Sequence, residues 1–142
     1  MENCPITFDA PPDESLRQLL KDAKTIAVVG LSPKEDRDSN RVARYLGEHG
    51  YKVVPVNPRF DEILGERCYP DLAAVPEHVD IVDIFRGVDA IAGIVDEAIA
   101  VGAGTVWMQL GLVQEQAAEK ARSAGLCVVM NKCIKIEHSR LM

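Results

Sequence analysis

Five short runs of hydrophobic residues alternate with longer amphipathic segments along this chain. The runs are Thr25–Val29, Lys52–Val56, Asp80–Phe85, Thr105–Leu110 and Leu126–Met130. Each run is hydrophobic at nearly every position rather than at every second one. Both faces of the strand that each run forms are therefore predicted to be buried, as in a parallel sheet.

The segments between these runs have the periodicity of helices. The pattern predicts helices over Asp13–Ala23, Arg41–His49, Ala90–Val101 and Gln114–Ser123. Gly50, Gly102 and Gly125 follow three of them, where a glycine readily takes the positive φ that ends a helix. The region from 61 to 79 contains Gly65 and two prolines, and we expect it to be irregular apart from one short helix.

Strands that alternate with helices of this length form right-handed βαβ units. The sequence therefore predicts an α/β protein, with a doubly wound parallel five-stranded sheet in the strand order 3-2-1-4-5. A length of 142 residues suits a single domain over 1–142. Residues 1–10 are expected to be loosely ordered.

The charge and hydropathy of the chain disfavour two classes of protein. A formal net charge of −6 argues against a nucleic-acid partner, because affinity for a phosphate backbone comes from clustered Lys and Arg. A small anionic ligand stays open, since a few local cations decide its binding. No apolar run approaches the roughly 18 residues of a membrane span, and the acidic N-terminus does not resemble a signal peptide. We expect a cytoplasmic protein without membrane association.

The spacing of cysteines and histidines favours neither a metal site nor a redox motif. Cys4, Cys68, Cys127 and Cys133 form no CxxC pair, and we predict that they are free thiols. The three histidines lie far apart in the sequence, whereas metal ligands are usually clustered. No metal site is therefore predicted.

A general rule of open parallel sheets locates the ligand before any family is considered. Ligands bind outside the carboxyl ends of the strands, near the point where the strand order reverses. The rule selects Gly30–Arg41, Asn57–Arg59, Arg86–Gly87, Gln109–Gly111 and Asn131–Lys132. Arginine, lysine and amide side chains recur in these segments, so the edge is locally cationic and an anionic ligand fits it.

The loop that follows the first run ends in two residues that often cap helices. We predict that Ser39 and Asn40 act as N-caps. The backbone N–H groups and the dipole at such a helix start suit a phosphate, and Arg41 adds a full charge. The alternative is that this pair is an ordinary cap on an ordinary helix.

The absence of two nucleotide-binding motifs disfavours two further classes of ligand. The loop has no GxGxxG and no GxxxxGK[ST], which argues against the pyrophosphate turn of NAD-binding domains and against an NTPase. Arg59 follows the second run where NAD-binding proteins place an acidic residue. An arginine there suits a ribose phosphate, as in NADP or coenzyme A (CoA).

The sequence assigns no catalytic residue. There is no GxSxG motif. Cys133 follows Lys132, a cation that would lower the pKa of a thiol, but a buried structural cysteine is the competing interpretation. His138 either faces the ligand edge or has a capping or packing role near the C-terminus.

Four segments, in this order, resemble a known family: PVNP, DIF, WMQLG and NKCIKIEH. They resemble the stand-alone CoA-binding proteins of bacteria, and the match extends from about Ala23 to Leu141. These proteins are similar to the CoA-binding domain of the succinyl-CoA synthetase α subunit. The resemblance implies a Rossmann-like, nucleotide-binding fold with CoA as its cofactor.

The resemblance also implies a cofactor-binding role for individual residues. Gly30, Ser32, Pro33 and Lys34 would form the first loop, and phosphate would be met at the helix N-terminus by Ser39, Asn40 and Arg41. The residues bordering the adenosine and its 3′-phosphate would be Asn57, Pro58 and Arg59, with Phe85 and Arg86 on the adenine or diphosphate side. The pantetheine arm would contact Met108, Gln109 and Gly111, and its thiol end Asn131 and Lys132.

The resemblance does not extend to the chemistry of the synthetase. That enzyme works through a phosphorylated histidine in a second domain and needs a partner subunit, and this sequence has neither. We therefore expect a protein that binds CoA or an acyl-CoA without ligase activity of its own. Two alternatives remain: an NADP- or CoA-dependent enzyme that uses Cys133 or His138, and an interaction module with a vestigial cofactor site. The apolar Ala90–Val101 helix would support a homodimer, and an unknown protein partner is the other option.

Overall fold

The computed structural model describes residues 12–142. The expectation of loose order for residues 1–10, and everything concerning Cys4, therefore lie outside the described part of the chain. The central element is a parallel sheet of five strands in the order β2-β1-β5-β6-β7. Its strands are β1 (Thr25–Val29), β2 (Lys52–Val56), β5 (Ile81–Ile84), β6 (Thr105–Met108) and β7 (Cys127–Val129).

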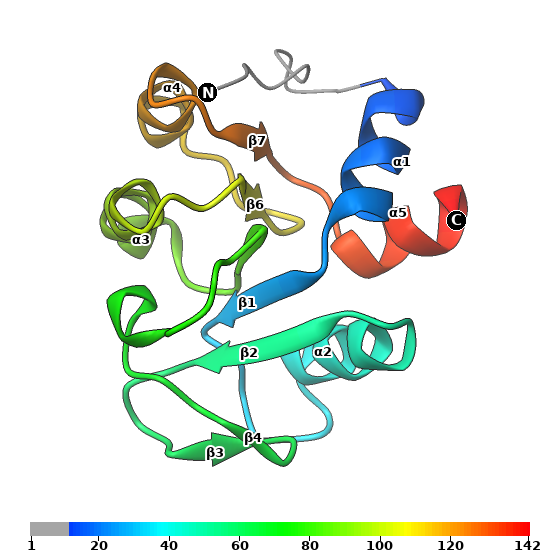
Figure 1. Ribbon diagram of the computed structural model, residues 1–142, viewed down its shortest axis with the longest axis vertical. Coiled ribbons are helices and arrows are strands. Elements are labelled where there is room, and N and C mark those ends of the chain that lie inside the picture. Colours follow the sequence, from blue (N-terminus) through cyan, green and yellow to red (C-terminus); the bar gives the residue numbers. More distant parts are fainter. Residues whose placement is uncertain (1–11) are drawn as a thin grey trace.

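Two layers of helices enclose this sheet, which confirms the predicted α/β class (Figure 1). One side carries α3 (Val88–Ala100) and α4 (Glu115–Ser123). The other side carries α1 (Asp13–Asp22), α2 (Asp38–Glu48) and α5 (Ile134–Leu141).

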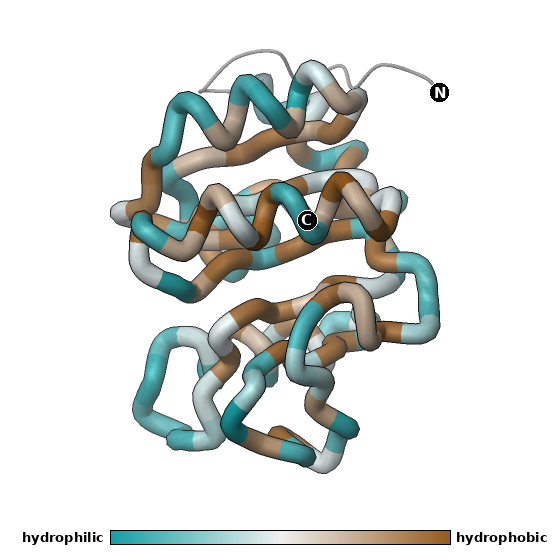
Figure 2. The backbone as a smooth tube through the Cα atoms, turned by 90° about the vertical axis from the view of Figure 1, so that its left-hand side faces the viewer, coloured by the Kyte–Doolittle hydropathy of each residue, from teal (hydrophilic) through white to brown (hydrophobic). Residues whose placement is uncertain are grey.

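Alternate residues of each strand point into the two layers, which explains the continuous hydrophobic runs. In β1, Ala27 and Val29 pack against the α3–α4 side, whereas Ile26 and Val28 pack against the other. Figure 2 shows hydrophobic stretches along the strands and hydrophilic stretches in the outer loops. Within the described residues, no helix is long and apolar enough to cross a membrane.

The predicted strand order is wrong. The third hydrophobic run forms β5, which lies beside β1 and not beside β2. The outer edge of β2 instead meets Tyr69, whose N–H donates to Pro55 O (3.0 Å) and whose carbonyl accepts from Asn57 N–H (2.8 Å). Because Pro55 has no N–H to offer a further strand, it suits the edge of a sheet. If the five hydrophobic runs are numbered along the chain, the observed order is 2-1-3-4-5. The strand order therefore reverses between β1 and β5.

Several local predictions also need correction. Helix α5 was not predicted, and the irregular region contains a hairpin of β3 (Glu62–Ile63) and β4 (Glu66–Arg67) before the short 3₁₀ helix η1 (Leu72–Ala74). Helix α2 begins at Asp38, three residues earlier than expected.

Cys68 and Cys133 are free thiols as predicted, whereas Cys127 is disulfide-bonded.

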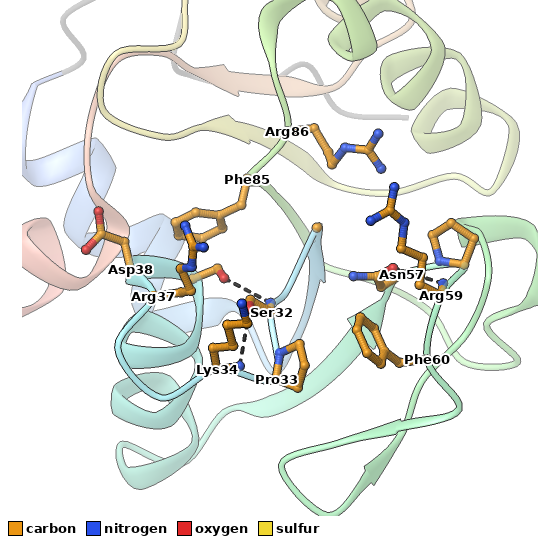
Figure 3. Close-up of a pocket in the computed structure, with 13 residues that line it drawn as sticks. Ser32, Pro33, Lys34, Arg37, Asp38, Asn57, Arg59, Phe60, Phe85 and Arg86 are labelled. Carbon is orange, nitrogen blue, oxygen red and sulfur yellow. Dashed lines mark hydrogen bonds between the residues drawn. The ribbon is translucent and has the colours of Figure 1, made fainter.

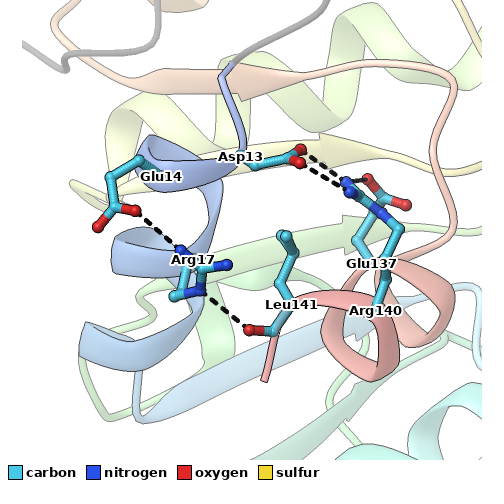
Figure 4. A network of polar contacts seen from close by, with 6 residues as sticks. All are labelled: Asp13, Glu14, Arg17, Glu137, Arg140 and Leu141. Atoms are coloured by element: carbon cyan, nitrogen blue, oxygen red, sulfur yellow. Dashed lines mark hydrogen bonds and ion pairs between the residues drawn. The ribbon is translucent and has the colours of Figure 1, made fainter.

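The first and last helices are joined by a network of exposed polar contacts (Figure 4). Arg140 donates two hydrogen bonds to Asp13, both of 2.9 Å, and a third to Glu137 (2.9 Å). Arg17 Nε donates to the carbonyl oxygen of Leu141 (3.0 Å). The hydrogen bond from Arg140 lowers the pKa of Asp13. Because Arg140 and Asp13 are both exposed to water, their ion pair orients α1 against α5 rather than adding much stability.

Candidate functional site

A cavity of about 780 Å³ opens at the carboxyl ends of β1, β2 and β5 (Figure 3). The loop after β1 forms one wall, and the segments after β2 and β5 form the others. The lining residues are Gly30, Ser32, Pro33, Lys34, Arg37, Asp38, Ser39, Asn57, Pro58, Arg59, Phe60, Phe85 and Arg86. We call it the first cavity. It lies at the strand-order reversal, where open parallel sheets bind their ligands.

Gly30 allows the three strand ends to approach closely. Its φ is +89°, and a Cβ at this position would lie 2.5 Å from the carbonyl oxygen of Phe85. Its N–H donates to Val56 O (2.9 Å). Any side chain here would both strain the backbone and push the β1 and β5 loops apart.

The side chains of Ser39 and Asn40 hydrogen-bond to the first loop, and neither residue is the predicted N-cap. The N-cap of α2 is Arg37, and both residues lie in the first turn of the helix. Ser39 Oγ accepts a hydrogen bond from Ser32 N–H (3.0 Å), and Asn40 Nδ2 donates to Ser32 O (2.8 Å). These side chains therefore bond to the loop ahead of the helix and fix its shape.

Asn57 connects the first loop to the segment after β2. Its Nδ2 donates to Leu31 O (3.1 Å), and its Oδ1 accepts from Arg59 N–H (3.0 Å). The buried thiol of Cys68 contacts the Asn57 carbonyl at 3.4 Å, and burial raises the pKa of this thiol. Both ends of Asn57 are thus used structurally, which fixes the backbone from which Arg59 extends.

The first cavity is strongly cationic, although the protein is acidic overall. Lys34, Arg37, Arg59 and Arg86 line it, and none of them forms an ion pair with another described residue. The one carboxylate in the lining, Asp38, is paired with Arg41 outside it (3.0 Å).

In Figure 3, the guanidinium groups of Arg59 and Arg86 lie near each other, and Lys34 and Arg37 lie on the opposite side of the cavity. Like charges held together without a counter-charge favour a bound anion.

The start of α2 adds backbone donors to the same cavity. The N–H groups of Asn40 and Arg41 both donate to Arg37 O (3.1 Å each). The N–H groups of Asp38 and Ser39 have no acceptor among residues 12–142. Unpaired N–H groups at the positive end of a helix dipole suit a phosphate.

A second cavity, of about 470 Å³, adjoins the first and has a more apolar lining. The two share Asp38, Phe85 and Arg86. The remaining lining residues of the second cavity come mainly from α2, the end of β6 and α5: Arg41, Val42, Gln109, Leu110, Leu112, Cys133, Lys135 and Ile136. Together, the two cavities offer a cationic site that continues into an apolar one.

Most of the predicted site residues lie at these cavities. Ten line the first cavity: Gly30, Ser32, Pro33, Lys34, Ser39, Asn57, Pro58, Arg59, Phe85 and Arg86. Arg41 and Gln109 line the second. The list of individual residues missed Arg37, Asp38 and Phe60 in the first cavity, and Val42, Leu110, Leu112, Cys133, Lys135 and Ile136 in the second. Lys34 and Arg37 lie in one charged loop, so the loop itself was the available signal for Arg37.

Five predicted residues line neither cavity. Met108 is fully buried in the core of the α3–α4 side, and Asn40 is fully buried beneath the first loop. The other three, Gly111, Asn131 and Lys132, make hydrogen bonds that hold the loops after β6 and β7. Asn131, at φ +57°, accepts a hydrogen bond from Gly111 N–H (2.7 Å), and the Lys132 carbonyl accepts from Trp107 Nε1 (2.8 Å).

His138, the other titratable candidate, lines neither cavity. His138 is buried between α2 and α5, hydrogen-bonded through Nδ1 to the Tyr45 hydroxyl (2.8 Å). Burial lowers the pKa of His138. Its packing role agrees with the second of the two interpretations above. Within residues 12–142, no group of three His, Cys, Asp or Glu side chains is placed to hold a metal ion.

Known proteins match this chain over most of its length. The family described as "CoA binding domain" matches residues 24–139. The Bacillus subtilis protein named "Uncharacterized protein YneT" is 36% identical over 91% of this chain and 96% of its own length. A hypothetical protein from Pyrococcus horikoshii OT3 of known structure is 43% identical, covers 99% of both chains and superposes with a TM-score of 0.92.

A longer relative connects the fold to a class of enzymes. The ADP-forming acetate–CoA ligase I of Archaeoglobus fulgidus is 29% identical over 78% of this chain, which corresponds to 18% of the ligase. The similarity is therefore limited to one part of the ligase, its CoA-binding region. With the family match extending over most of its length, this chain belongs to the CoA binding domain family.

Proposed function

We propose that this protein binds CoA or an acyl-CoA at the carboxyl edge of its sheet, without ligase activity of its own. One observation carries the proposal: four cations without ion-pair partners among the described residues surround a single cavity of an otherwise acidic protein. A CoA molecule carries its negative charge in a diphosphate and a 3′-phosphate. Such a charge distribution matches two groups of cations on opposite sides of one cavity.

The two cavities divide the ligand between them. The diphosphate lies against the free N–H groups at the start of α2 and near Lys34 and Arg37. The 3′-phosphate lies at Arg59, beyond the end of β2. The pantetheine arm passes Phe85 and Arg86, which both cavities share, and enters the second cavity, where apolar side chains cover its aliphatic parts.

The proposal is confined to binding. The similarity to the ligase spans 18% of that enzyme, so its activity is not carried over. Incubation of the protein with acetate, ATP, magnesium and CoA is expected to yield no acetyl-CoA. Formation of acetyl-CoA, measured by chromatography, would contradict this part of the proposal.

Calorimetric titration with CoA, dephospho-CoA, acetyl-CoA and NADP tests the ligand. We expect CoA to bind more tightly than NADP, and dephospho-CoA to bind more weakly than CoA. In Arg59→Ala, the affinity for CoA should fall about 10- to 150-fold, which is the loss of a charged hydrogen bond, whereas that for dephospho-CoA should change little.

Arg67→Ala is the matched control, because Arg67 is an arginine that lies over Tyr69 and lines neither cavity. Its affinity for CoA should equal that of the unchanged protein. Equal losses of CoA and dephospho-CoA in Arg59→Ala would remove Arg59 from the 3′-phosphate. A preference for NADP, or no binding of CoA, would overturn the proposed function.

A further inference from the structure

The lining of the second cavity includes a largely buried polar side chain, Gln109, that hydrogen-bonds through only one end of its amide. Gln109 is 5% exposed and lines this cavity. Its Oε1 accepts a hydrogen bond from Ile134 N–H at the start of α5 (3.1 Å). That bond identifies the oxygen, so the other end of the amide is the donor, and Nε2 has no acceptor among the described residues.

Gln109 Nε2 is not one of the fully buried, unpartnered polar atoms of the described residues, so this donor is open to the cavity and can donate to an acceptor of a ligand. The pantetheine arm of CoA contains two amide carbonyls. A carbonyl at Nε2 would satisfy Gln109 and hold the end of the arm in the second cavity.

Cys133 lines the same cavity as Gln109. Its thiol is free and partly exposed, and the residue precedes Ile134, to which Gln109 is bonded. Cys68, the other free thiol of the described residues, is buried and contacts the Asn57 carbonyl. The one accessible free thiol of the described chain thus lies in the cavity that would take the thiol end of the ligand.

We propose that Cys133 is a modification site that forms a mixed disulfide with the sulfur of CoA. The inference rests on the proposed function, since the nucleotide must be held in the first cavity for its sulfur to reach the second. The co-reactant is the symmetrical disulfide of CoA. The Cys133 sulfur, as thiolate, attacks one sulfur of that disulfide, and the bond between the two CoA sulfurs breaks.

The exchange balances without any other oxidant. A new bond joins Cys133 Sγ to one CoA sulfur. The second CoA leaves as a thiolate and takes up the proton that Cys133 released. The protein thiol is oxidised, and one half of the CoA disulfide is reduced. Bound CoA would then report the thiol–disulfide balance of the CoA pool as a covalent adduct.

The test is intact-protein mass spectrometry over time after CoA disulfide is added, with peptide mapping to locate the adduct. Glutathione disulfide, at equal concentration, is the control for chemistry without nucleotide recognition. We expect one CoA per chain, on Cys133, formed at least about tenfold faster than the glutathione adduct, because binding raises the local concentration of the disulfide. Arg59→Ala should slow the reaction with CoA disulfide and leave that with glutathione disulfide unchanged.

Two variants isolate the site. Cys133→Ser should form no adduct, whereas Cys68→Ser should react like the unchanged protein. Equal rates with the two disulfides, or an adduct at another cysteine, would overturn the inference.

Calorimetry of Cys133→Ser with CoA under reducing conditions separates this inference from the proposed function. Retained CoA binding together with an unmodified Cys133 in the unchanged protein overturns the modification site alone. An absence of CoA binding in both proteins overturns the proposed function and this inference with it.

Discussion

The two faces of the sheet differ in what they bury. The side covered by α3 and α4 is filled with Val, Ile, Ala, Leu and Met. The side covered by α1, α2 and α5 also contains buried polar groups, among them Asn40 of α2, His138 of α5 and Asp83 of β5. Asp83 is placed on this side by its alternation with Ile81, which packs there.

The polar groups lie on the side whose helices also line the cavities. Asn40 Oδ1 and both oxygens of Asp83 are buried and have no hydrogen-bond partner among residues 12–142. Unpaired buried groups reduce stability. Both sides bury a hydrophobic core, and the side with α1, α2 and α5 gives up some of the resulting stability while it shapes the site.

The largest effect on stability should come from a substitution in the core between the sheet and α3–α4. Ile91 of α3 is fully buried, so Ile91→Ala should lower the free energy of unfolding by about 2–5 kcal/mol. The affinity of the folded protein for CoA should not change. Ile136→Ala is the matched substitution in the second cavity, where the side chain is 56% exposed. It should have the opposite profile, with nearly unchanged stability and weaker CoA binding. Urea denaturation and calorimetry measure both, and a loss of affinity in Ile91→Ala would contradict the division between the two sides.

The next largest effect should come from Asp83. Burial raises the pKa of Asp83 well above its ordinary value of 3.8, so the folded protein holds this proton more tightly than the unfolded chain does. The stability of the protein should therefore fall as the pH rises above that ordinary value. Asp83→Val should raise the free energy of unfolding by about 1–4 kcal/mol at pH 8, with a smaller gain at pH 4. Urea denaturation at the two pH values measures this difference, and a destabilised variant at pH 8 would contradict the prediction.

Ser39→Ala should have a moderate effect on both properties. It removes the acceptor of the Ser32 N–H, whose hydrogen bond contributes about 0.5–1.5 kcal/mol. The first loop should loosen, so CoA affinity should fall several-fold. Arg44 donates to the carbonyl oxygen of Glu35 in the same loop, but from the exposed face of α2, so Arg44→Ala is the milder change to that loop. If both variants bind CoA like the unchanged protein, the shape of the loop does not determine affinity.

The smallest effect should be the pH dependence that His138 contributes. Because burial lowers the pKa of His138, the unfolded chain binds a proton more readily than the folded protein does. Stability should therefore decline as the pH falls below the ordinary histidine value of 6.5. His138→Gln should flatten the dependence of Tm on pH between about 7.5 and 5. An unchanged slope would assign this dependence to other groups.

The positions of the five strands could be predicted from hydrophobicity alone, because strands buried on both faces have no polar side. The order of the strands could not, since the hydrophobic pattern does not say which neighbour each strand chooses. Pro55 lies in β2, and a proline within a strand indicates an edge strand. This residue could therefore have placed β2 at the edge of the sheet.

The candidate site was predictable as a set of loops and less so as individual side chains. A general rule locates the carboxyl edge, and most of the predicted residues there line a cavity. The roles of Ser39 and Asn40 depended on where α2 begins, and a shift of three residues changed them from caps into fasteners of the loop. The second cavity was missed because α5, which forms one of its walls, has a weak helical pattern.

The contacts that join α1 to α5 have a consequence for protein engineering. Asp13 and Arg140 hold the beginning and the end of the described chain side by side. A short peptide linker could therefore join the two ends, and new termini could be opened at the exposed turn around Gly65 between β3 and β4. Such a circular permutant would keep both cavities intact. A fluorescent reporter inserted at the new termini would then lie near the start of β2, where Leu64 and Glu66 share a cavity with Lys52, and away from the edge that is proposed to hold the ligand.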